Sequence, residues 1–78
     1  MKEKEILNLI KEMTEEEQRL YAKGNEISDE EKTILKSLQV QLDQFWDLLR
    51  QRRARKEFGD DPDKAKLRGP GTVENYEQ

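Results

Sequence analysis

The residues best suited to binding chemistry are five cations within seven consecutive positions. They are Arg50, Arg52, Arg53, Arg55 and Lys56. An arginine guanidinium donates two parallel hydrogen bonds to a phosphate or a carboxylate, so this run could bind nucleic acid, another polyanion or an acidic protein. A structural role competes with binding, because cations stabilise the C-terminal end of a helix and the acidic residues Glu57, Asp60, Asp61 and Asp63 follow closely. Polyanion binding is therefore our second hypothesis.

The sequence offers few groups for catalysis or metal binding. Its 78 residues include no Cys and no His, so thiolate nucleophiles, imidazole bases and the commonest metal ligands are missing. Glu17 falls on an apolar helical face, but a di-metal helical bundle needs Glu-x-x-His pairs. We expect Glu17 to reach solvent or pair with a cation, because a lone buried carboxylate is costly. We predict no enzyme activity, no catalytic residue, no metal site and no cofactor.

A first amphipathic helix is predicted over residues 3–23. Large apolar residues recur there at steps of three and four, as on one face of a helix. They are Ile6, Leu9, Ile10, Met13 and Leu20. Gly24 follows a cation and predicts the end of the helix. A capping-box pattern at Thr14 and Glu17 leaves open a second interpretation, in which this helix is divided in two.

A second helix is predicted over residues 28–58. Ser28 and Glu31 match a capping box at its start, and Gly59 ends the pattern. Its apolar seam has heptad-like spacing and consists of Leu35, Leu38, Leu42, Phe45 and Leu49. Two helices joined by a short turn run antiparallel. The predicted fold class is all-α, an antiparallel two-helix hairpin over residues 1–58 with an irregular tail over 59–78.

The tail is expected to be extended and partly mobile, with at most a short helical turn around residues 63–67. Val73 and Tyr76 are the candidate anchors that would dock it on the hairpin. Because the second helix is the longer one, the part after Leu49 should project beyond the start of the first helix. Either an external partner or the acidic tail from Asp60 onward would lie against this basic projection.

The apolar arc of the second helix is wider than one neighbouring helix requires. It spans roughly 160° at 100° per residue, which suits a helix with two neighbours. A second hairpin would supply the missing neighbour, so we predict a homodimer that forms a four-helix bundle. The predicted dimer or partner interface comprises Ile34, Leu38, Leu42, Phe45, Trp46, Leu48 and Leu49. The alternative is a monomer with an exposed apolar stripe.

The charge balance argues against general attraction to nucleic acid or to a membrane. Charged residues make up 42% of the chain, and the net charge is −3. No apolar run approaches the roughly 18 residues of a membrane span. The first five residues carry both signs of charge, unlike a signal peptide. We expect a cytoplasmic protein without a membrane partner, and we expect a nucleic-acid partner less than a protein partner.

Several segments resemble a known family. They are the LDQFWDLLRQRRAR sequence at 42–55, its extension back to residue 38, and the segments 27–31, 59–63 and 72–78. Together they resemble a family of short bacterial proteins, common in actinobacteria, that is classed as a domain of unknown function. The resemblance implies a helical hairpin and brings no activity, cofactor or catalytic residue. Our first hypothesis is therefore a non-enzymatic, self-associating interaction module, whose partner is a second copy or an unidentified protein.

Overall fold

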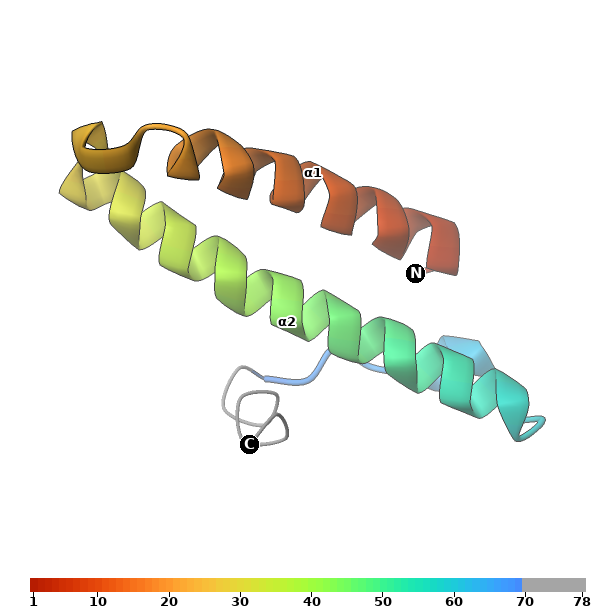
Figure 1. Ribbon diagram of the computed structural model, residues 1–78. Coiled ribbons are helices and arrows are strands. Elements are labelled where there is room, and N and C mark those ends of the chain that lie inside the picture. The colour runs from red at the N-terminus through yellow and green to blue at the C-terminus, as the bar shows by residue number, and fades with distance from the viewer. Residues whose placement is uncertain (70–78) are drawn as a thin grey trace.

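The computed structural model describes residues 1–69 and consists of two long helices and two short helical turns. The elements are α1 (Glu3–Tyr21), η1 (Gly24–Glu26), α2 (Asp29–Glu57) and η2 (Pro62–Lys64). Figure 1 shows α1 and α2 antiparallel and joined at one end, so the predicted all-α hairpin is confirmed. Neither long helix has an apolar stretch sufficient to cross a bilayer. The predicted tail anchors Val73 and Tyr76 lie outside the described residues.

Helix α1 is one continuous helix of 19 residues, so the interpretation that divided it at Thr14 is wrong. It ends at Tyr21, slightly before the predicted boundary. The chain leaves the helix there because Gly24 adopts a left-handed backbone with φ +55°. A residue with a side chain rarely adopts this conformation, which explains the glycine in the turn.

Helix α2 has the predicted cap at its start. The Glu31 backbone N–H donates to Ser28 Oγ at 3.1 Å, and the Ser28 N–H donates to Glu31 Oε1 at 3.0 Å. Its end is marked by Gly59 with φ +75°. The amides of residues 59 and 60 return to carbonyls of the last helical turn at 3.2 and 2.7 Å, which is a Schellman motif.

The core lies between the two helices and extends around one side of α2. Its buried apolar residues are Ile6, Ile10, Leu20, Leu42, Leu48 and Leu49. The predicted seam supplies Leu42 and Leu49, whereas Leu48 lies roughly 120° around α2 from Leu42. Ala65 from beyond the hairpin packs against the same cluster. The side of α2 that carries Leu48 is therefore covered by the chain after Gly59.

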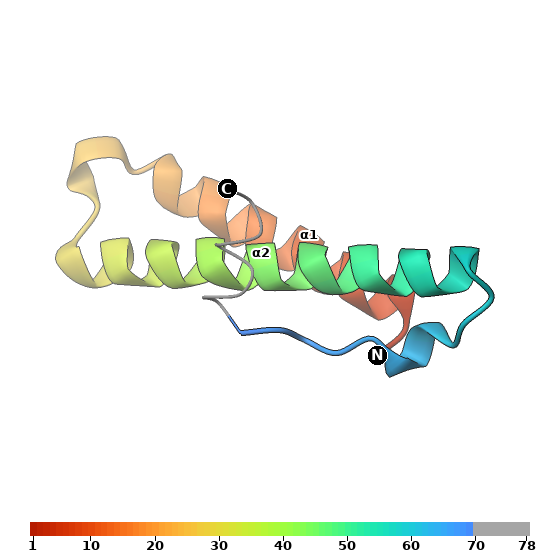
Figure 2. The ribbon, with the colours of Figure 1, turned by 90° about the horizontal axis from the view of Figure 1, so that it is seen from below.

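That covering chain is residues 59–69, here called the return segment. Figure 2 shows it turning at the end of α2 and running back beside the helix. The turn η2 begins at Pro62, whose fixed φ suits the first position of a helical turn. The sequence predicted that either an external partner or the acidic tail would lie against the basic end of α2. In the described structure the acidic tail lies there.

We predict that Ser28→Ala lowers the free energy of unfolding by about 1 kcal/mol, because the Glu31 amide loses its acceptor. Chemical denaturation followed by circular dichroism measures this change. Ser37→Ala is the matched control, since it removes the same hydroxyl from an exposed position inside α2. The control should be neutral or slightly stabilising because alanine favours helix. Equal losses in the two variants would contradict the role of the cap.

Candidate functional site

The predicted cation run is placed in several different environments. Arg52 is buried, with 9% of its surface exposed. Its Nη1 donates to Asp63 Oδ1 at 2.9 Å and to the Pro62 carbonyl at 3.2 Å. Arg52 therefore holds η2 against α2, and this guanidinium has a structural role.

Two further arginines of the run are engaged by carboxylates. Arg53 Nε donates to Glu3 Oε1 at 2.9 Å, which joins the end of α2 to the start of α1. Arg55 Nη1 donates to Asp60 Oδ2 at 2.7 Å across the turn that ends α2. The acidic residues after α2 thus neutralise part of the run, as the structural interpretation predicted. The two pairs are partly exposed to solvent, and ion pairs in such positions contribute little to stability.

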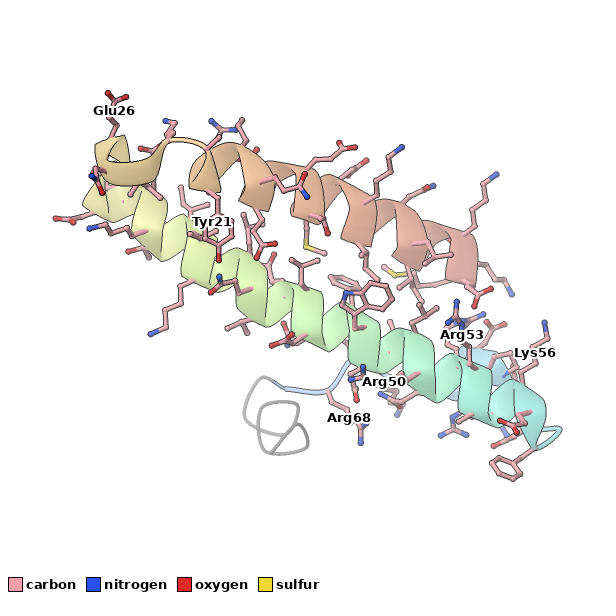
Figure 3. The ribbon with its side chains drawn as sticks, viewed as in Figure 1. Tyr21, Glu26, Arg50, Arg53, Lys56 and Arg68 are labelled. Carbon is pink, nitrogen blue, oxygen red and sulfur yellow. The ribbon has the colours of Figure 1, made fainter. Side chains whose placement is uncertain are left out.

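The remaining cations of the run, Arg50 and Lys56, are exposed and form no ion pair with a described residue. Lys56 lies beside a cavity of about 280 Å³ at the junction of α1, α2 and η2, and Figure 3 shows it near Arg53. The cavity is lined by Glu3, Arg52, Arg53, Lys56 and Pro62. Arg52 Nε is buried and has no hydrogen-bond partner among the described residues. This cavity gathers three of the five cations of the run, Arg52, Arg53 and Lys56.

A buried carboxylate in the middle of α2 was not anticipated from the sequence. Only 1% of Asp47 is exposed. Arg68 binds it with two guanidinium nitrogens, Nε to Oδ2 at 2.8 Å and Nη2 to Oδ1, and Gln51 Nε2 donates to Oδ2 at 2.9 Å. The bidentate Arg68 contact is the chief reason that the pKa of Asp47 lies below its ordinary value. Asp47 is therefore a charged anchor for the return segment.

Two glutamines extend this anchor along α2. Gln44 Nε2 donates to the Arg68 carbonyl at 3.1 Å, and Gln51 Nε2 donates to the Lys66 carbonyl at 2.8 Å. Gln44, Asp47 and Gln51 are spaced by three and four, so they form a polar stripe on one helical face. That stripe is the sequence signal that could have identified a docking face for an extended chain.

The predicted interface residues do not form one exposed surface. Leu42, Leu48 and Leu49 are buried within the single chain, and Leu38 and Phe45 are half-buried. Ile34 and Trp46 retain 49% and 42% exposure. The wide apolar arc of α2 therefore contacts both α1 and the return segment, which accounts for its width without a second copy.

One edge of the hairpin still presents apolar groups, and we call it the Trp46 flank. It consists of Leu7, Tyr21, Gln39 and Trp46. At one end, Gln39 Nε2 donates to the Tyr21 hydroxyl, so Gln39 and Tyr21 lie on the same side of the hairpin. Trp46 follows Gln39 by seven residues, which places it on that side of α2. Leu7 precedes Tyr21 by 14 residues, about four helical turns, which places it on the same side of α1 as Tyr21. Leu7, Tyr21 and Trp46 expose 39%, 56% and 42% of their surfaces.

The carboxylates of the described residues do not gather into a metal-binding cluster. Glu17 is half-buried on α1 and forms no ion pair with a described residue. Of the two expectations for this carboxylate, contact with solvent therefore holds, and pairing with a described cation does not. The arrangement supports binding surfaces, and the two candidates are the Trp46 flank and the cationic cavity.

We predict that acid weakens the return segment. Hydrogen bonds from Lys2 and Arg52 lower the pKa of Asp63 from 3.8 to about 2. Because the folded-state pKa is the lower one, the stabilisation is present above pH 3.8 and is lost as the pH falls through about 2. The thermal midpoint should therefore drop between these values. Asp63→Asn should flatten this part of the profile, whereas Glu12→Gln, at an exposed site without an ion pair to a described residue, should not. Profiles of equal steepness in wild type and Asp63→Asn would contradict the assignment.

Comparison with known proteins identifies the family. The family described as "Protein of unknown function (DUF2630)" matches residues 2–78, and the chain belongs to it. The resemblance stated from the sequence is thereby confirmed. Similar proteins include the uncharacterised proteins Rv0898c of Mycobacterium tuberculosis (strain H37Rv) and Mb0922c of Mycobacterium bovis. Each is 41% identical over 75 residues, which cover 92% of this chain and 86% of the relative. No solved structure matches the chain.

Proposed function

We propose that this member of the DUF2630 family is a non-enzymatic helical interaction module that associates with a second copy of itself through the Trp46 flank. The carrying observation is the exposure of Trp46, which leaves 42% of its surface open near the middle of α2. Large aromatic side chains at the centre of a surface supply much of the binding energy in protein interfaces. Leu7 on α1 adds a second partly exposed apolar group to this flank.

The burial of the other flank supports this choice of surface. Leu48 is covered from within the chain, since Ala65 packs on its cluster and Arg68 binds the neighbouring Asp47. A partner would have to displace the return segment to reach Leu48. No such displacement is needed at Trp46. Near the middle of α2, the open edge of the apolar arc is therefore the Trp46 edge, whereas Ile34 is exposed near the start of the helix. A partner at the Trp46 edge would shield this part of α2 from water.

We predict that the wild-type chain sediments at tens of micromolar with about twice its 9.3 kDa mass, and that Trp46→Glu shifts it toward the monomer. A carboxylate at the centre of an apolar contact is costly to desolvate. Because Trp46 is the only tryptophan, its fluorescence maximum should also move to shorter wavelength as concentration rises.

Phe58→Ser is the control for this experiment. Phe58 is the most exposed large apolar residue among those described, at 84%, and lies where α2 ends, away from the Trp46 flank. Its replacement should leave the mass of the assembly unchanged. A wild-type chain that stays monomeric at every concentration would contradict the proposed function.

The second candidate function is binding of an oxyanion, such as a nucleic-acid phosphate, at the cationic cavity. The specific observation in its favour is that Arg52, Arg53 and Lys56 all line one cavity of about 280 Å³. Glu3 also lines it and already accepts from Arg53, which reduces the positive charge available to a ligand. This competition for the guanidinium is why the candidate ranks second.

We predict that, if this second function operates, the double change Arg53→Gln and Lys56→Gln removes salt-sensitive retention on a DNA or RNA column. Lys4→Gln with Lys11→Gln is the matched control, because both lysines are exposed on α1 and form no ion pair with a described residue. The control should be retained like the wild type. Absence of wild-type retention at low salt would exclude nucleic acid as the ligand.

A further inference from the structure

Four charged residues form a regular row along α2. Lys36, Asp43, Arg50 and Glu57 follow one another at intervals of seven residues, and their charges alternate in sign. Seven residues are close to two turns of an α-helix, so the row stays within about 60° of the helix surface. Lys36, Arg50 and Glu57 are exposed and Asp43 is half-buried.

The row forms no ion pair within the part of the chain that the structure describes. None of its four members forms an ion pair with a described residue, although the neighbouring Arg52, Arg53 and Arg55 all do. The row adjoins the Trp46 flank, since Trp46 follows Asp43 by three residues and precedes Arg50 by four. Figure 3 shows Arg50 and Arg68 together at α2, and both line a second cavity with Asp47.

We infer that the partner on the Trp46 flank is a second copy of this chain whose α2 lies antiparallel to the first, related by a two-fold axis beside Trp46. The inference rests on the proposed function and specifies its geometry. About an axis between positions 46 and 47, each member of the row faces the member equally far on the other side of the midpoint. Asp43 then faces Arg50 of the second copy, and Lys36 faces Glu57 of the second copy.

The charges select this orientation over the alternative. In a parallel arrangement in register, each member of the row would face the same residue of the other copy, and all four contacts would be between like charges. In the antiparallel arrangement all four contacts are between opposite charges. Trp46 lies at the centre of both copies, where a two-fold interface places its most buried groups. The row from 36 to 57 extends over roughly 30 Å of helix, which is long enough for a helix–helix interface.

The same pattern argues for a second copy over other occupants. A nucleic acid or another polyanion would match Lys36 and Arg50 but would be repelled by Asp43 and Glu57. A uniformly basic partner would meet the reverse difficulty. When a second copy is related to the first by a two-fold axis, every charge of the row faces an opposite charge. A second copy therefore pairs all four charges without any other kind of molecule.

The test compares the dimer dissociation constant of four chains by sedimentation: wild type, Asp43→Arg, Arg50→Asp and the double exchange. Each single change creates two like-charge contacts in the symmetric dimer and should weaken association by about tenfold or more. The double exchange restores both attractions and should return the dissociation constant to within about threefold of wild type. Glu12→Arg is the control and should have no effect, because Glu12 is exposed on α1 and forms no ion pair with a described residue.

The outcomes distinguish the geometry from the proposed function. The antiparallel geometry alone is overturned if the wild type dimerises and neither single reversal changes the dissociation constant. It is also overturned if the double exchange dimerises as weakly as the single reversals. A wild-type monomer overturns the proposed function as well.

Disulfide trapping gives a second measurement that does not depend on charge reversal. The natural chain has no cysteine, so a crosslink can form only between the introduced residues. An oxidised mixture of Asp43→Cys and Arg50→Cys chains should form a crosslinked heterodimer. Crosslinking of each variant only with itself would overturn the geometry.

Discussion

The burial of Asp47 is the constraint on which the arrangement of this small protein depends. A carboxylate with 1% exposure in the middle of a helix is unfavourable unless a cation accompanies it. Arg68 supplies that cation and makes a bidentate contact, and it lies 21 residues further along the chain. To reach Asp47, the chain must turn at Gly59 and run back along α2. The return segment is therefore fixed on the hairpin by this charge pair as well as by the packing of Ala65 against the core.

This layer determines which surfaces remain for other molecules. The return segment covers Leu48 and brings Asp63 to Arg52, so much of the predicted cation run is occupied from within the chain. The apolar arc of α2 is consequently satisfied on two sides, by α1 and by residues 59–69. Trp46 remains partly exposed because it lies at an edge of α2 that these neighbours cover only in part. An interface on this protein is more readily built at that edge than at the arginines.

Features that depend on local sequence were predictable, and features that depend on distant pairing were not. The Ser28 cap and the left-handed Gly24 follow from a few neighbouring residues, and the seam through Leu42 and Leu49 follows from periodicity. The Asp47–Arg68 pair joins residues far apart in the sequence, and composition offers many possible partners for each. The docking of the return segment also uses the backbone carbonyls of Lys66 and Arg68, so the glutamine donors on α2 are visible in the sequence whereas their acceptors are not. For the same reason, Leu48 was assigned to a partner interface although the chain itself buries it.

The order of charges on α2 adds orientation to an apolar contact that has little of its own. Exposed ion pairs contribute little affinity, so Trp46 and its apolar neighbours must supply most of any binding energy. An aromatic patch alone, however, would accept a partner helix in either direction. The row from Lys36 to Glu57 removes this ambiguity, because reversing the partner exchanges every attraction for a repulsion. Regularly spaced charges that form no ion pair with a described residue thus fit the proposed contact between two copies better than a general polyanion-binding surface, since half of them are acidic.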